Sequence, residues 1–285
     1  NEKKYQPDII SGISAGAILA LPLALGRFEE TRKLVLHFGL NNFFNESPIN
    51  QNGRFRILNA AKNILLGNHY LGRQDQLEKT IRGVISEKDF NNYKKDKHSA
   101  VCIVGAVDFY TGSRVYVNLK ELPNLNLALK FINASASLPI FTAGIKLHTS
   151  FKDFEGQVFN RKVMLYDGGI RDHSPTARIL KSKIFTISET CTLFSRPEDN
   201  EILQSNRFKP NNLLQILQRY VEITNTEISK DDELFEKQLI LKLKIKNHGT
   251  FFLPKVMNGV YDVRPEHLQQ IYEEGKNSVR SNWIV

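Results

Sequence analysis

A serine flanked by glycines stands close to the start of the chain, in residues 9–16 (IISGISAG). Ser14 lies between Gly12 and Gly16, after a short β-branched run and before a long apolar one. A sharp strand-to-helix turn of small residues raises a serine hydroxyl above the edge of a sheet, because neighbouring backbone can pass close by. The first amides of the helix, beginning at Ala15, then face that oxygen and stabilise the oxyanion of an acyl transfer. The segment therefore predicts a nucleophile elbow.

A nucleophilic serine needs a base, and a candidate carboxylate follows a second apolar run, residues 162–166. That run ends in Asp167, followed by Gly168 and Gly169. We expect a strand to deliver Asp167 to a sheet edge, where the two glycines permit a turn with positive φ beside the carboxylate. Taken alone, Asp-Gly-Gly is also typical of a hairpin turn.

Two histidine-dependent classes fit the sequence less well. Ser14, Asp167 and His248 follow the chain order of an α/β-hydrolase triad, but the elbow of that class follows several strands, whereas thirteen residues precede Ser14. Malonyl-CoA:ACP acyltransferases share the elbow but carry a histidine before the serine, where this chain has Ile13. Asp167 stays a candidate that could take the serine proton directly.

Together, the two segments resemble the patatin-like phospholipase family, whose dyad is the serine of Gly-x-Ser-x-Gly and the aspartate of Asp-Gly-Gly or Asp-Gly-Ala. The resemblance implies that Ser14 and Asp167 cleave fatty-acyl esters of phospholipids or related lipids through an acyl-enzyme, with neither cofactor nor metal. It also implies a three-layer α/β/α fold around a central, mostly parallel sheet. The other stretches that carry the resemblance are residues 12–18 with Gly26, 107–112, 134–141 and 271–275.

Two features depart from the family pattern. A glycine-rich stretch that supplies most of the oxyanion hole normally precedes the serine; it is absent from the printed chain, which begins at Asn1, and we expect it upstream. His173 stands where relatives usually have asparagine, and we expect it to form hydrogen bonds rather than to catalyse. Three functional alternatives stay open: a thioesterase or a neutral-lipid lipase using the same dyad, and a non-catalytic lipid-binding protein.

The remaining pattern predicts one α/β domain over residues 1–285. Residues 28–95 are expected to be rich in helix and to form a lid or cap, with an amphipathic stretch at 55–66. Four aromatic residues of this region are expected to pack in the core or, less commonly, to line an acyl channel: Phe38, Phe43, Phe44 and Tyr70. The other expected elements are a hairpin over 99–117, helices over 124–132, 212–224 and 265–283, and strands over 184–187 and 239–246.

The charge and composition of the chain indicate which classes of partner it binds. With 39 Lys and Arg against 30 Asp and Glu, the net charge is +9, which favours an acidic partner. The lysines are scattered without a nucleic-acid motif, so we expect an anionic membrane surface and no nucleic acid. The apolar run 13–25 is too short to span a bilayer, which predicts a cytoplasmic or peripheral membrane protein. Cys102 and Cys191 lack metal-ligand spacing and are expected to be free thiols.

Overall fold

The computed structural model describes residues 6–50, 56–196, 198, 213–253 and 264–282. By their contacts the residues form two compact units: unit 1 comprises 1–50 and 56–169, and unit 2 comprises 51–55 and 170–285. Ser14 and Asp167 both belong to unit 1, which ends directly after the Asp-Gly-Gly sequence. The single domain expected over 1–285 stays a prediction.

Unit 1 is built on a five-stranded mixed sheet. Its strands are β1 (Ile9–Gly12), β3 (Val101–Asp108), β4 (Ser113–Asn118), β6 (Ile145–Leu147) and β9 (Val163–Asp167). Strand β1 pairs with β3 in parallel, whereas β4 and β9 pair with β3, and β6 with β9, in antiparallel fashion. Smaller pairs in this unit are parallel β2 (Tyr70–Gly72) with β5 (Ile140–Thr142), and antiparallel β7 (Phe151–Lys152) with β8 (Val158–Phe159).

The fold class is confirmed as mixed α/β with a central, partly parallel sheet, but the expectation of a mostly parallel one is wrong. The predicted hairpin accounts for part of the difference, because β4 follows β3 through a tight turn at Gly112, whose φ is +69°. A connection this short joins antiparallel strands only. Strand β9 then also runs against β3.

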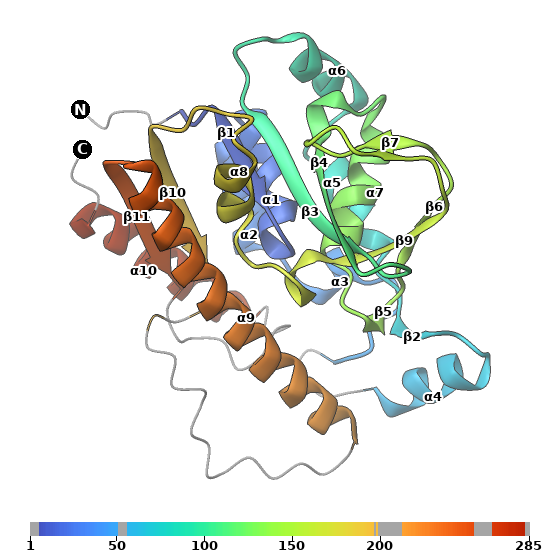
Figure 1. Cartoon of the computed structure of the whole chain (residues 1–285). Helices are drawn as coiled ribbons and strands as arrows, with labels where there is room; N and C mark the ends of the chain where they lie inside the picture. Colours follow the sequence, from blue (N-terminus) through green and yellow to red (C-terminus); the bar gives the residue numbers. More distant parts are fainter. Residues whose placement is uncertain (1–5, 51–55, 197, 199–212, 254–263, 283–285) are drawn as a thin grey trace. The chain divides into compact units, whose positions relative to one another are not determined.

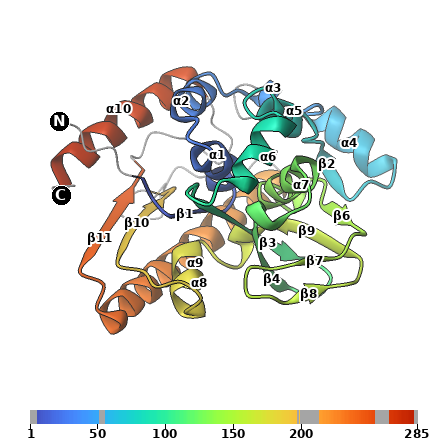
Figure 2. The ribbon, with the colours of Figure 1, turned by 90° about the horizontal axis from the view of Figure 1, so that it is seen from above.

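Helices α1 (Ala15–Ala24) and α7 (Leu125–Ser135) pack against this sheet. Helix α7 begins at the predicted place, where the Asn124 side chain accepts a hydrogen bond from the Leu127 amide at 2.9 Å. Helices α5 (Gln76–Arg82) and α6 (Glu87–Lys95) contact α7, as Figure 2 shows. Helix α2 (Phe28–Leu36) contacts α1 in Figure 1. Two fully buried phenylalanines of this helical layer, Phe90 and Phe131, belong to the core.

The predicted helix-rich region 28–95 is present, and it also holds α3 (Leu40–Phe43) and α4 (Ile57–Leu65). Phe43 and Phe44 are buried, whereas Phe38 and Tyr70 are half-buried. Burial of the first two agrees with the expectation of core packing. That this region acts as a lid stays a prediction.

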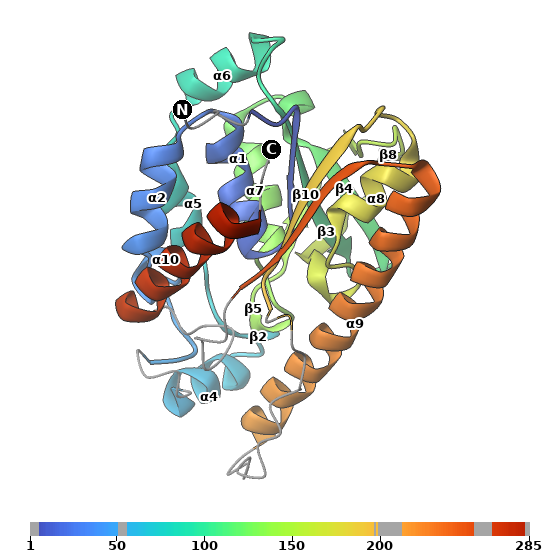
Figure 3. The same ribbon diagram turned by 90° about the vertical axis from the view of Figure 1, so that its left-hand side faces the viewer.

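Unit 2 contains α8 (Pro175–Ser182), β10 (Glu189–Phe194), α9 (Leu213–Leu243), β11 (Asn247–Phe252) and α10 (Pro265–Asn282). Strands β10 and β11 pair in parallel, and α8 packs on α9 (Figure 3). The predicted helix from 265 is confirmed as far as the structure describes it, to Asn282.

Two strand predictions in unit 2 are wrong. Residues 184–187 are not a strand, and the strand of this region is β10, which begins at Glu189. Residues 239–243 continue helix α9, which extends the helix expected over 212–224 by almost twenty residues; residue 212 lies outside the described residues. The predicted strand would bury Leu241, which is 76% exposed, whereas the buried residues Glu236 and Ile240 are four apart, as on one face of a helix.

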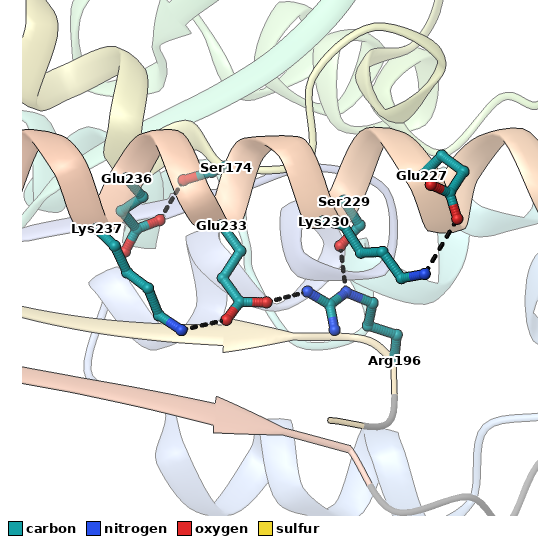
Figure 4. Close-up of polar contacts among 8 residues, drawn as sticks. All are labelled: Ser174, Arg196, Glu227, Ser229, Lys230, Glu233, Glu236 and Lys237. Atoms are coloured by element: carbon teal, nitrogen blue, oxygen red, sulfur yellow. Dashed lines mark hydrogen bonds and ion pairs between the residues drawn. The ribbon is translucent and has the colours of Figure 1, made fainter. Parts of the chain in front are cut away.

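A polar cluster on α9 ties this helix to the rest of unit 2 (Figure 4). The buried Arg196 guanidinium pairs with Glu233 and donates from Nε to the Ser229 hydroxyl at 2.8 Å. Lys237 pairs with Glu233 at 2.6 Å. One turn along, the buried Glu236 accepts a hydrogen bond from the Ser174 hydroxyl, which also caps α8.

No helix among the described residues combines the length and apolarity needed to cross a membrane.

Candidate functional site

Two strands meet end to end along one edge of β3. Strand β1 pairs in parallel with the first half of β3 and ends at Gly12, whereas β9 pairs antiparallel with the second half and ends at Asp167. Strand β4 pairs along both halves, so it occupies the other edge of β3 and leaves β1 and β9 to share this one. The β3 partners of Gly12 and Asp167 are the residues on either side of Gly105. This register brings the turn that holds Ser14 and the end of β9 together from opposite directions.

Close backbone approach at this junction requires glycine. A Cβ on Gly105 would lie 2.8 Å from the Tyr116 ring and 2.9 Å from the Ile13 side chain. A Cβ on Gly12 would lie 2.3 Å from the carbonyl carbon and oxygen of Gly16. Gly12 is therefore needed for the elbow to close, as its spacing predicted, whereas Gly105 is a residue of the site that no sequence pattern indicated.

Ser14 has the backbone conformation of a strained turn residue. Its φ is 56° and its ψ is −124°, a region that L-residues with side chains rarely occupy. Helix α1 begins at the next residue, and Ala15 and Gly16 are exposed at its first turn. The Gly16 amide donates to the Ile13 carbonyl at 2.9 Å, but the Ala15 amide has no hydrogen-bond acceptor among the described residues. That amide is free to bind an oxyanion formed beside Ser14.

Residues 135–137, which begin at the last residue of α7, form hydrogen bonds to both halves of the site. The Ser14 amide donates to the Ser135 hydroxyl at 3.1 Å, and this buried hydroxyl donates to the Gly105 carbonyl at 2.5 Å. The Asp167 amide donates to the Ser137 carbonyl at 2.8 Å. The family resemblance included this small-residue segment, but sequence spacing gave no reason to assign Ser135 a position under the elbow.

The Asp167 carboxyl is buried, and its pKa is raised toward neutral pH. Burial raises the pKa of Asp167 to about 7, against the smaller opposing effects of the Gly169 amide and the Ser14 hydroxyl. The Gly169 amide donates to Oδ1 at 2.8 Å. The Ser14 hydroxyl is near enough to lower the pKa of Asp167, yet Oδ2 forms no well-aligned hydrogen bond within the described ranges. Such loose contacts are typical of catalytic pairs before substrate binds.

Gly168, the other glycine of the Asp-Gly-Gly turn, also serves close packing. A Cβ at Gly168 would lie 2.8 Å from the Gly105 carbonyl oxygen, so a side chain there would push the turn away from β3. Residues Gly168–Ile170 form one turn of 3₁₀ helix, and this turn places the Gly169 amide against the carboxylate. The sequence is thus not a simple hairpin turn between two strands.

His173 and His248 both lie in unit 2. The His173 amide donates to the Asp232 carboxylate at 2.5 Å, and His248 lies on β11. Both cysteines are free, as predicted. Within the part of the chain that the structure describes, no three His, Cys, Asp or Glu residues are grouped as metal ligands would be.

Comparison with known families places this geometry in context. A family model described as patatin-like phospholipase matches residues 1–180, which is more than half of the 285 residues. The match includes the elbow, the β3–β4 hairpin, residues 135–137 and the Asp-Gly-Gly turn. A comparison with curated proteins gave no significant match.

Proposed function

Because the chain belongs to the patatin-like phospholipase family, we propose that it hydrolyses fatty-acyl esters of phospholipids or related lipids through a dyad of Ser14 and Asp167. Family membership supports a lipid hydrolase in general terms. The observation that carries the finer proposal is the convergence of β1 and β9 at Gly105, which sets a strained serine beside a buried carboxylate.

Asp167 has the properties of a general base for Ser14. A base is most effective when its pKa lies near the working pH, and the pKa of Asp167 is about 7. In its ionised form, Asp167 accepts the Ser14 proton as the hydroxyl oxygen attacks the ester carbonyl. The tetrahedral intermediate then collapses, the alcohol departs with a proton from Asp167, and an acyl-enzyme remains.

Deacylation reverses the roles of the same groups. Asp167 takes a proton from a water molecule, the hydroxide attacks the acyl-enzyme, and the fatty acid leaves as the proton returns to Ser14. In both half-reactions the developing oxyanion accepts a hydrogen bond from the Ala15 amide and is stabilised by the positive end of α1. Loss of one oxyanion donor typically costs about 10²–10³ in turnover, so the geometry of this first helical turn matters as much as the dyad.

Hydrolysis by purified variants tests the proposal. We expect wild-type protein to release fatty acid from phospholipid vesicles, and Ser14→Ala and Asp167→Asn each to abolish release while circular dichroism stays unchanged. Lys183→Ala, at an exposed position in unit 2, is the matched control and should be fully active. Retained hydrolysis in either dyad variant would contradict the assignment of that residue.

A substrate panel separates the remaining candidates. Release from an acyl-CoA alone would make the protein a thioesterase, and release from triacylglycerol emulsions alone would make it a neutral-lipid lipase. Lipid binding without turnover of any ester would identify a non-catalytic member of the family.

A further inference from the structure

Among the side chains of α4 that the structure describes, an asparagine is buried and large apolar residues are exposed. Asn63 is 3% exposed, donates to the Leu71 carbonyl at 3.0 Å and accepts from Asn68 at 2.9 Å. Leu58 and Leu65 are each 86% exposed. Soluble helices normally bury the apolar stripe and expose the polar one. The leucines of α4 therefore do not serve the core of unit 1.

The exposed residues form one face. With 3.6 residues per turn, Leu58, Lys62 and Leu65 fall within about 60° of one another around the helix axis. Asn63 lies about 140–160° from the two leucines, on the side where it donates to the Leu71 carbonyl of β2. Ile64 and Leu66 are also exposed, but they lie about 120° and 80° from Leu58 around the axis, on either side of this face. We call Leu58, Lys62 and Leu65 the leucine face.

The charged residues near α4 in the sequence are all basic. No acidic residue occurs in residues 47–74, which contain Arg54, Arg56, Lys62 and Arg73. Arg73 pairs with Asp75 at 2.6 Å, whereas Lys62 forms no ion pair in the portion of the chain that is described. Arg56 and Lys62 are exposed at the start of α4 and within the leucine face.

The position of Lys62 favours a lipid surface over a protein partner. Cores of protein interfaces are depleted of charged residues, and lysine is especially rare there. At a membrane, however, a lysine chain lies along apolar surface while its ammonium group reaches the phosphates. Exposed leucines combined with basic residues are the composition of helices that lie in the interfacial region of bilayers.

We propose that α4 docks on bilayers that contain anionic phospholipid, with the leucine face entering the acyl boundary and Arg56 and Lys62 meeting the phosphates. The inference rests on the proposed function in so far as that function requires access to lipid aggregates. Docking itself requires no turnover, so it is measured separately from catalysis.

Vesicle co-sedimentation of Ser14→Ala protein tests the docking in the absence of hydrolysis. On phosphatidylcholine vesicles with phosphatidylglycerol, adding Leu58→Ser and Leu65→Ser should lower the partition coefficient about tenfold or more. Lys62→Glu changes the charge by two units and should lower the partition coefficient about 25-fold on these vesicles, because each charge near an anionic surface contributes about a factor of five. The loss should be much smaller on phosphatidylcholine alone. The matched control replaces two exposed leucines of α9, Leu234 and Leu241, by serine and should bind as its parent.

Equal binding by the α4 double variant and its parent would overturn the proposal, as would an equal loss in the α9 control. A change in oligomeric state of the α4 variant in size-exclusion chromatography, without a change in vesicle binding, would instead make the leucine face a contact between copies of this chain. Hydrolysis of a soluble short-chain ester by protein with native Ser14 should be unaffected by the α4 substitutions. If that ester is not cleaved at all, the proposed function fails while the docking result stands.

Discussion

Hydrolysis of a soluble ester should rise steeply between pH 5 and pH 8, because Asp167 must lose its proton before it can act as a base. With a pKa of about 7, Asp167 is about 1% ionised at pH 5 and about 90% ionised at pH 8. We therefore expect kcat/KM to increase about 90-fold over this interval. With the ordinary aspartate pKa of 3.8, the same interval would change kcat/KM by only about 6%.

The assay is kcat/KM for a short-chain ester that does not itself ionise, measured at constant ionic strength, since this parameter reports ionisations of the free enzyme. Circular dichroism at each pH establishes that the fold persists. A flat profile from pH 5 to pH 8 in folded protein would refute the assignment of Asp167 as the base. An inflection near pH 4 would show that burial does not perturb this carboxyl.

Four further predictions concern the groups that build the site and unit 2. Because folding raises the pKa of Asp167 from 3.8 to about 7, the folded state binds this proton more tightly, and stability falls as pH rises through that window. Asp167→Asn should therefore raise the free energy of unfolding at pH 8 by up to about 4 kcal/mol and by little near pH 4, as measured by urea titration. Gly12→Ala should destabilise the protein by about 1–3 kcal/mol and lower kcat/KM, because the added Cβ would lie 2.3 Å from the Gly16 carbonyl. In the control Gly16→Ala the added Cβ meets no atom within 4 Å, and this variant should unfold as wild type. Ser135→Ala leaves the Ser14 amide and the Gly105 carbonyl without their partner and should cost about 1–3 kcal/mol, with a fall in kcat larger than the change in KM; an unchanged kcat would contradict its positioning role. Arg196→Ala removes one of the two cations paired with the half-buried Glu233 and the donor to the Ser229 hydroxyl, and it should cost about 1–3 kcal/mol in thermal or urea unfolding. A loss below about 1 kcal/mol would show that the pair contributes only as a surface ion pair does.

The sequence was informative where local chemistry requires a residue type. Gly12 and Ser14 are predictable because a tight strand-to-helix turn needs a small residue before the serine, and the structure gives the steric reason in the Gly16 carbonyl. The Asp-Gly-Gly turn is predictable for the same kind of reason. What could not be predicted is the register that joins them, because it depends on pairing between β3 and strands far away in the chain.

The roles of Gly105 and Ser135 could not be predicted from the sequence. Gly105 sits inside an apolar run, where a glycine usually signals only a weak strand, and nothing local shows that two other strands end beside it. Ser135 ends a helix that was predicted, but its role depends on the distant Ser14 amide. The β-strand expected over 239–246 failed for a related reason: a short alternation of apolar and basic residues is compatible with two periods, and the preceding turns of α9 decide in favour of helix.

Covalent labelling by a fluorophosphonate ester tests the Ser14–Asp167 dyad most directly, because the reagent phosphonylates only an activated serine. Peptide mass spectrometry should find one adduct, on Ser14, with a labelling rate that falls as Asp167 is protonated below pH 7. Asp167→Asn should slow labelling by two or more orders of magnitude, and Ser14→Ala should abolish it. An adduct on a different residue, or equal labelling rates for wild type and Asp167→Asn, would contradict the dyad.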